Sequence, residues 1–179
     1  MGSPSQVEAN DFILKLLADW QIKNVSTPQK LLTLRNKMFS ILTVKPYNDE
    51  TKDAEKQIRW KRTGAQVLED GYVYQGKACT DLVIAFIALA RAAGVENTNF
   101  VKLKNNNTGM VHSVGEFKLE DGWYIFDIAN KNSTPVKGEI KSNVPWGGPP
   151  NGPFLLWKKG GDSWALELTD FDSIGKIKV

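Results

Sequence analysis

Three side chains in this sequence have the chemistry of a nucleophilic enzyme: Cys79, His112 and Asp127. Cys79 is the only cysteine and His112 the only histidine in 179 residues. A cysteine thiolate attacks a carbonyl, a histidine takes and returns the proton, and an aspartate fixes the imidazole's orientation and tautomer. A free cysteine is also a common buried apolar side chain, and a lone histidine on a strand is often structural. The role of the three residues therefore depends on the elements that carry them.

Cys79 directly precedes a segment that predicts a buried helix. Residues 82–93 are almost wholly apolar and lack Pro and Gly, and Gly94 then supplies a C-cap. The N-terminus of a helix carries partial positive charge and free N–H groups, which stabilise a thiolate and also an oxyanion. Asp81 opposes the thiolate but suits the first turn of a helix. The position of Cys79 therefore favours a reactive thiol.

His112 and Asp127 fall on two consecutive predicted strands. A two-residue turn at Asp121-Gly122 would place both side chains on one face of the sheet. It would also set Asp127 opposite Glu116, about 13 Å along the strand from His112. We therefore expect a longer loop, or a β-bulge near Gly115, if the two side chains are in contact.

The pattern along the chain predicts helices first and antiparallel strands later, which indicates an α+β domain spanning residues 1–179. Residues 1–5 are interpreted as a tag or a flexible terminus. One amphipathic helix is expected after an N-cap at Asn10 or Asp11, and a second begins at Thr27-Pro28 and continues to Pro46. Residues 48–63 are interpreted as solvated helix or loop, with a solvated basic group of Lys56, Arg59, Lys61 and Arg62. The expected strands are Phe100–Lys104, Met110–Leu119, Trp123–Ile128, Phe154–Trp157, Trp164–Leu168 and Ile174–Val179.

Composition excludes several classes of protein. One cysteine cannot form an internal disulfide, and one Cys with one His cannot build a four-ligand structural zinc site without several carboxylates. The net charge of +3 is too small to suggest nucleic-acid binding. The longest apolar run, Leu82 to Ala90, is far shorter than the ~20 residues of a membrane span. No signal peptide and no organic-cofactor motif is visible, so the compartment stays open; the Asn- and Lys-rich composition is compatible with a microbial origin.

Two blocks of sequence resemble the transglutaminase-like superfamily of papain-like thiol enzymes. Residues 76–81 and the Arg91-Ala92-x-Gly94-Val95 ending are similar to the family's G-x-x-C-x-D helix. In the second block the family's Glu, Trp and Asp follow the His at fixed offsets, here as His112, Glu116, Trp123 and Asp127. The resemblance covers about residues 63–130. The chain departs from the family at Ser113-Val114, where Ala-Trp is frequent, and at Ile128-Ala129, where Pro-Thr is frequent.

The resemblance implies a papain-like fold, with Cys79 starting a central helix packed on an antiparallel sheet. It implies that His112 and Asp127 lie on neighbouring strands and form a catalytic triad with Cys79. The implied activity is acyl transfer on peptide or protein amides through a thioester on Cys79. From the sequence itself we expect no cofactor and no bound metal. The backbone N–H of Cys79 would hold the oxyanion. A second donor would lie upstream, with Trp60, Tyr74 and Gln75 as candidates.

Several alternatives remain open at this point. Water would resolve the thioester in a peptidase, amidase or deamidase, and a lysine amine in a cross-linking transglutaminase. Hydrolysis is expected, because a small chain lacks the additional domains of large cross-linking enzymes. Two alternatives to a thiol enzyme are a non-catalytic binding module with this fold and a zinc enzyme that uses Cys79, His112 and Asp127 as ligands. Trp146, in a Gly/Pro-rich loop, either lines a substrate cleft or packs in a surface turn. The sequence does not determine the oligomeric state.

Overall fold

Helices precede a sheet along the chain in the computed structural model, which describes residues 4–177. The α-helices of this part of the chain are α1 (Asp11–Asp19), α2 (Pro28–Ser40), α3 (Lys52–Ile58), α4 (Gly64–Asp70) and α5 (Cys79–Ala92). Its strands are β1 (Thr43–Lys45), β2 (Tyr72–Tyr74), β3 (Thr98–Lys104), β4 (Val111–Leu119), β5 (Gly122–Phe126), β6 (Val136–Lys137) and β7 (Leu155–Gly160). The short 3₁₀ helices η1 (Trp164–Leu166) and η2 (Phe171–Lys176) follow β7.

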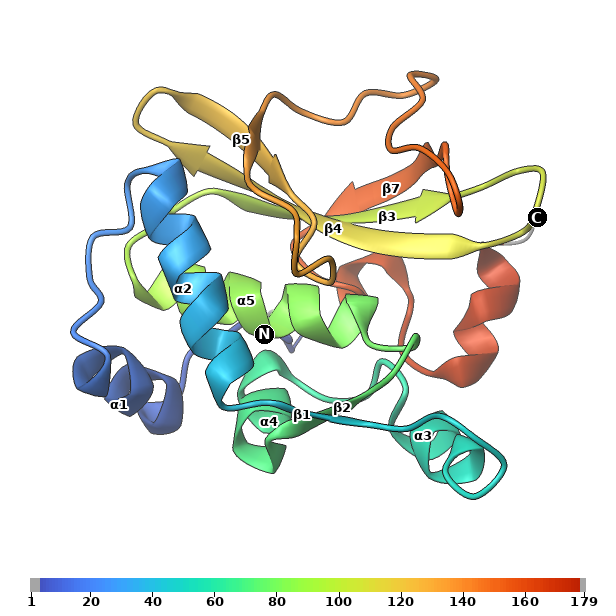
Figure 1. Cartoon of the computed structure of the whole chain (residues 1–179), viewed down its shortest axis with the longest axis horizontal. Helices are drawn as coiled ribbons and strands as arrows, with labels where there is room; N and C mark the ends of the chain where they lie inside the picture. Colours follow the sequence, from blue (N-terminus) through green and yellow to red (C-terminus); the bar gives the residue numbers. More distant parts are fainter. Residues whose placement is uncertain (1–3, 178–179) are drawn as a thin grey trace.

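The main sheet has the strand order β6-β5-β4-β3-β7, and every neighbouring pair in it is antiparallel. A separate short pair, β1 and β2, is parallel. The sheet lies over one side of α5, while α4 and the β1–β2 pair lie on the other side (Figure 1). This arrangement confirms the predicted α+β fold with a central buried helix packed on an antiparallel sheet.

The central helix α5 is enclosed along almost its whole length. Every residue from Thr80 to Ala90 is buried, as the apolar run predicts. The Phe86 ring meets Phe117 of β4 and Phe126 of β5 edge to face, at centroid distances of 5.2 and 5.6 Å. Gly94 takes a φ of 103° directly after the C-cap and ends the helix as predicted. The helix begins at Cys79, earlier than the apolar run itself.

The two N-terminal helices begin at the predicted caps. Asn10 accepts a hydrogen bond from the Ile13 N–H, and Thr27 accepts one from the Lys30 N–H with Pro28 at the first helical position. The second helix does not continue to Pro46, as predicted, but ends at Ser40. Its expected last turn is instead the strand β1, whose edge pairs with β2.

The prediction for residues 48–63 is only partly correct. The segment contains α3, but two members of the basic group are not solvated. The side chain of Arg62 is 7% exposed and binds Asp81 at 2.7 Å and Asp70 at 3.0 Å. Arg59 is 10% exposed and pairs with Glu55. Their carboxylate partners allow the guanidinium groups to be buried.

Two predicted strands near the C-terminus are wrong. The segment 164–168 contains η1, and residues 174–176 belong to η2; the last residues of the predicted strand, 178–179, lie outside the described part of the chain. The Gln6 side-chain carbonyl accepts hydrogen bonds from the N–H groups of Ser163 and Trp164 and from the Ser163 hydroxyl. Asp170 and Ser173 form a capping box that starts η2. These polar contacts fix helical turns in a segment whose apolar spacing is typical of a strand.

Within residues 4–177, no helix is both long enough and apolar enough to cross a lipid bilayer.

Gly64 marks the closest approach of α4 to α5. A Cβ added there would lie 2.8 Å from the Ile84 carbonyl oxygen and 3.0 Å from the Ala88 Cβ. We predict that Gly64→Ala lowers the free energy of unfolding by roughly 1–3 kcal/mol, because two helix backbones must separate. Urea denaturation measures this effect. Gly161→Ala, at an open position with no atom within 4 Å, is the control; equal effects of both substitutions would contradict the prediction.

Candidate active site

Cys79 is the first residue of α5. The preceding Gly76 has a φ of 70°, which lets the chain turn into the helix, and the N-cap Ala78 makes no side-chain cap. Among the described residues, the backbone N–H of Cys79 has no hydrogen-bond partner. Asp81 does not act as an unpaired negative charge near the thiol, since Arg62 binds it at 2.7 Å. The start of α5 therefore offers a free donor beside a half-buried sulfur.

The hairpin that carries the other two candidates has a different register from the predicted one. Leu119 pairs with Gly122, so the turn consists of Glu120-Asp121. Pairing continues to Gly115 opposite Phe126, so Asp127 follows immediately and comes within two residues of His112 along the sheet. The register alone brings the two residues together, and neither the expected longer loop nor the expected bulge near Gly115 is present.

His112 and Asp127 are joined by a hydrogen bond. His112 Nε2 lies 3.0 Å from both carboxylate oxygens of Asp127, and the two side chains are 21% and 15% exposed. Burial opposes the charged imidazolium, but the hydrogen bonds to Asp127 and Cys79 outweigh it and raise the pKa of His112 to about 10. Because Asp127 occupies Nε2, Nδ1 is the ring nitrogen left for Cys79.

The pKa of the Cys79 thiol is shifted in the opposite direction, below its ordinary value. Burial disfavours the Cys79 thiolate, but the positive charge of Lys102 and the hydrogen bond from His112 overcome this and lower the pKa of Cys79 to about 6. The two shifts together favour a thiolate–imidazolium pair at neutral pH. Such a pair is chemically suited to attack a carbonyl carbon and then to protonate a leaving group.

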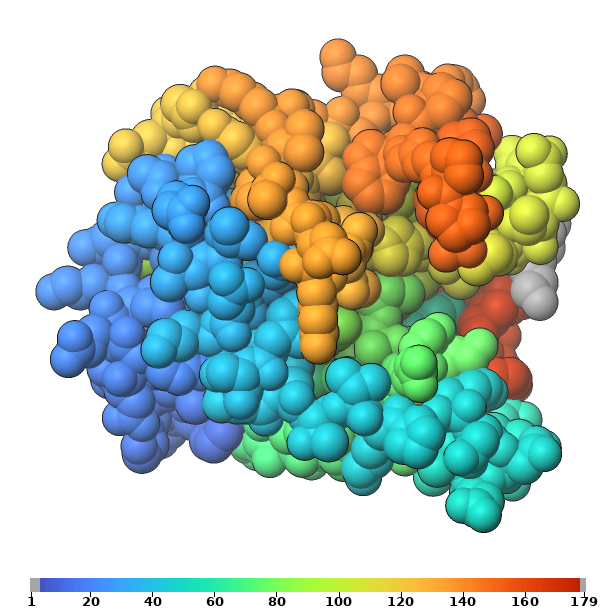
Figure 2. All heavy atoms as spheres, viewed as in Figure 1, coloured from blue at the N-terminus to red at the C-terminus, as the bar shows by residue number. Residues whose placement is uncertain are grey.

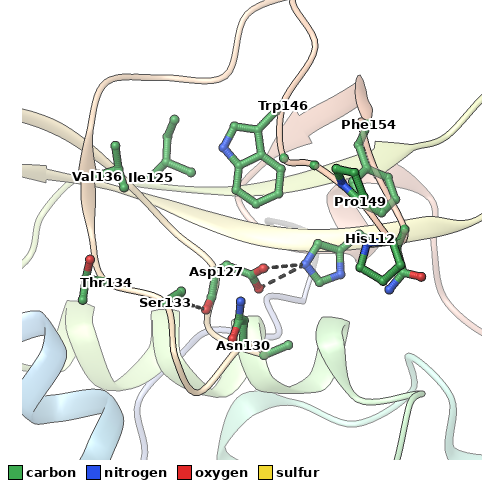
Figure 3. A pocket seen from close by; sticks show the side chains of 15 residues that line it. His112, Ile125, Asp127, Asn130, Ser133, Thr134, Val136, Trp146, Pro149 and Phe154 are labelled. Atoms are coloured by element: carbon green, nitrogen blue, oxygen red, sulfur yellow. Dashed lines mark hydrogen bonds and ion pairs between the residues drawn. The ribbon is translucent and has the colours of Figure 1, made fainter.

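Two cavities meet at His112. One, of about 500 Å³, lies on the Asp127 side and is lined by Trp146, Pro149 and Phe154 among others (Figure 3). The other, of about 320 Å³, includes Cys79. Figure 2 shows the surface hollowed between the orange loops and the green segment that leads into α5.

Trp146 lines the first of these cavities, as one of its two sequence interpretations expects. Its ring lies nearly parallel to the His112 imidazole, with 6.4 Å between the two ring centroids. The Phe154 ring is also stacked on the imidazole, at a centroid distance of 5.5 Å. These two rings limit the orientations that the imidazole can adopt. The loop is tied to the sheet by the Trp146–Phe154 bridge.

The three candidates for a second oxyanion donor lie in different places. Trp60 is buried and does not line the cavity that holds Cys79. Tyr74 and Gln75 both line it. The backbone N–H of Gln75 is bound by the Lys45 carbonyl, so only its side-chain amide is free to donate toward the cavity.

Some residues that organise the site carry no local signal in the sequence. Arg35 of α2 is buried and donates to the carbonyl oxygens of Asn130, Lys131 and Ser133, which hold the loop after Asp127. Lys102 is fully buried beneath the start of α5. A lysine or arginine in an otherwise apolar strand or helix face is the only sequence feature that points to them, and it does not identify their partners.

Glu116, at the family's Glu position, lies outside the two cavities. It is fully buried and accepts hydrogen bonds from the Ile140 N–H, the Lys159 ammonium and the Asn99 amide. It therefore ties β4 to β3, to β7 and to the loop after β6.

Within residues 4–177, no three His, Cys, Asp or Glu side chains are grouped so as to hold a metal ion.

One comparison with a known structure agrees with this architecture. A structure named "Putative Cysteine Protease from Cytophaga hutchinsonii" matches with a TM-score of 0.56 and 16% identity, over 93% of this chain and 47% of that one. The chain thus spans about half of that protein's length. Legionella pneumophila LapG matches with a TM-score of 0.49 and 16% identity over 94% and 85% of the two chains, and its EGTA-treated form with 0.47 and 14% over 94% and 91%.

No curated protein matches the chain in sequence. The family model of the transglutaminase-like superfamily matches residues 26–128, from the end of the α1–α2 connection to just beyond Asp127. This match covers more than half of the chain and includes Cys79, His112 and Asp127. The chain therefore belongs to the transglutaminase-like superfamily.

Proposed function

We propose that this protein is a cysteine-dependent acyl-transfer enzyme that acts on amide bonds of peptides or proteins. Cys79 is the nucleophile, His112 the acid and base, and Asp127 the residue that orients the imidazole. The observation that carries the proposal is the hydrogen bond of His112 Nε2 to Asp127, which leaves Nδ1 for Cys79 at the junction of two cavities. Membership of the superfamily supports the same assignment.

The proposed reaction has two halves. The Cys79 thiolate attacks the substrate carbonyl carbon, and the resulting oxyanion accepts a hydrogen bond from the Cys79 N–H. The C–N bond then breaks, the His112 imidazolium gives its proton to the leaving amine, and a thioester remains on Cys79. A second nucleophile loses a proton to His112 and attacks the thioester. The C–S bond then breaks, which releases the acyl product and restores the Cys79 thiolate beside the His112 imidazolium.

Water is the first acceptor to test for the second half. The fold neighbour from Cytophaga is named a cysteine protease, although at 16% identity it shows the fold alone. If a lysine amine takes the place of water, the same thioester leads to an isopeptide cross-link. The choice depends on which acceptor reaches the thioester from the cavity on the Asp127 side.

The lining of the cavity at Cys79 supports a preference for substrates with an apolar side chain next to the bond that is cleaved. Val44 and Met110 both line this cavity and remain 46% and 43% exposed. Leu82 and Phe39 continue the apolar wall. Exposed apolar side chains gathered at one cavity are characteristic of a binding surface.

The pH dependence of the thiol tests the nucleophile. We predict that alkylation of Cys79 by iodoacetamide rises with pH through a midpoint near 6, where the thiolate forms, well below the ~8.5 of a free cysteine. His112→Ala removes the imidazolium and raises the midpoint. Mass spectrometry of the intact protein measures the alkylation without ambiguity, because Cys79 is the only cysteine in the sequence. An ordinary midpoint that does not change in the variant would favour a non-catalytic binding module instead.

The identity of the acceptor is tested by product analysis. We predict that incubation with a peptide library gives cleaved peptides or released ammonia, and that Cys79→Ala abolishes both. Mass spectrometry with and without a primary amine distinguishes the two outcomes. Incorporation of the amine in preference to water would replace hydrolysis by transamidation and leave the thioester mechanism intact.

The apolar cavity gives a prediction about specificity. Met110→Asp should lower kcat/KM about tenfold for peptides with an apolar side chain beside the cleaved bond, chiefly through KM, because a charged group now faces that side chain. Steady-state kinetics on matched apolar and basic peptides measures the change. Leu14→Asp is the control, since Leu14 is at least as exposed as Met110 but lies on α1, away from both cavities. Equal losses for both peptides would contradict the assignment.

A further inference from the structure

The environment of Lys102 is unusual for a lysine. Its side chain, on β3 between β4 and β7, is fully buried, and in the described part of the chain no carboxylate pairs with it. A buried charge without a counter-ion is strongly destabilising. Packing alone would be served equally well by an apolar side chain of the same length. The ammonium group therefore requires an explanation.

The hydrogen bonds of the ammonium lead directly to the site. Lys102 Nζ lies 3.1 Å from the Thr80 hydroxyl and 3.0 Å from the Ser113 hydroxyl, and the Trp60 ring covers it at 4.6 Å. Thr80 follows Cys79 in the chain, and Ser113 follows His112. One cation thus holds together the two backbone segments that carry the proposed nucleophile and its acid–base partner.

The pattern of donors leaves one hydrogen free. An ammonium only donates, so both hydroxyl oxygens accept from Lys102. The two hydroxyls lie 2.9 Å apart, and one of them donates to the other. When Thr80 donates to Ser113, the Ser113 hydrogen is left for the Cys79 sulfur. A hydrogen bond from Ser113 is among the interactions that lower the pKa of Cys79.

We propose that Lys102 is a positioning residue that acts as the buried counter-ion of the Cys79 thiolate, through its charge and through the Thr80–Ser113 hydroxyl pair. No direct hydrogen bond joins Lys102 to the sulfur among residues 4–177, so the effect is electrostatic and relayed. This role deepens the proposed function and rests on it. It also gives a reason for Ser113 at a position where the family frequently has an alanine, which has no hydroxyl to relay.

The charges around this pair are few. The His112 imidazolium faces the sulfur from β4 with Asp127 behind it, and Lys102 faces it from β3. Arg59 is the other cation that acts on Lys102; it lowers the pKa of the ammonium, as burial does more strongly, while the Cys79 thiolate raises it. Arg59 is itself paired with Glu55. The thiolate is therefore the one anion that stabilises the Lys102 charge in this set.

The test is the pH profile of Cys79 alkylation in Lys102→Met. We expect the midpoint to rise by about one unit, so that alkylation is roughly tenfold slower at about pH 5 and nearly unchanged above about pH 9. Lys158→Met is the matched control: Lys158 pairs with Lys102 across β3 and β7, but its side chain is exposed. This control should retain the parent profile.

Thermal unfolding separates this role from a structural one. Replacement of a buried charge by Met is expected to leave the melting temperature unchanged or higher. A lower melting temperature with an unchanged midpoint would mean that Lys102 only supports the fold, and would overturn the proposal. Ser113→Ala provides a second measurement if Lys102→Met does not fold; it should raise the midpoint by a smaller amount, and an unchanged midpoint would exclude the relay.

The same experiment distinguishes the two proposals. A low midpoint in the parent that is retained in Lys102→Met overturns the role of Lys102 and leaves the proposed enzyme standing. An ordinary midpoint in the parent overturns both. A low parent midpoint that rises in Lys102→Met but not in Lys158→Met supports both.

Discussion

The enclosure of α5 is the constraint on which the rest of the structure depends. A helix with no solvent-facing side needs cover on every side, and the sheet, α4, α1 and α2 supply it. The same enclosure determines where the chain can carry reactive groups. Only the two ends of α5 reach the surface, and Cys79 stands at the first of them, where the apolar packing stops and the free N–H groups of the helix begin.

Burial of charge is the second theme of the site. Arg62 neutralises Asp81, Arg35 binds the loop after Asp127, and Lys102 binds the Thr80 hydroxyl at the start of α5. Each ion is held in an environment that disfavours it unless a partner is present. In the proposed role of Lys102, its ammonium gains an anionic partner only when Cys79 loses its proton. This attraction favours the thiolate over the thiol. The proposed role of Lys102 thus makes the protein's own polar interior, rather than solvent, the control on the protonation of Cys79.

The sequence predicts the features whose cause is local. The caps at Asn10 and Thr27 and the all-apolar face of α5 follow from neighbouring residues. The predicted hairpin register is wrong by one residue in each strand. Asp121-Gly122 is a strong turn signal, but the turn is formed by Glu120-Asp121, one residue earlier. At Gly115 an added Cβ would lie 2.6 Å from the Phe117 ring, so close packing, and no bulge, accounts for this glycine.

Features that depend on distant partners were not predictable from one sequence. The burial of Lys102 depends on Thr80 and Ser113, which belong to other elements. The helical turns near the C-terminus depend on Gln6, at the opposite end of the chain. The proposed triad lies between these extremes: motif spacing identifies Cys79, His112 and Asp127 as candidates, while the contact of His112 with Asp127 depends on a hairpin register that local signals misplace.

The contacts of Arg35 have a consequence for partial unfolding of the protein. Its guanidinium joins α2 to three backbone carbonyls of the loop that follows Asp127, and it also lies 4.8 Å from the centre of the Phe126 ring. Fraying or proteolytic trimming of the N-terminal helices would therefore release this loop as well. These contacts couple the N-terminal helices to the end of the hairpin, so a cut far from the cleft in sequence is expected to disorder the side of the cleft that holds His112 and Asp127 as well.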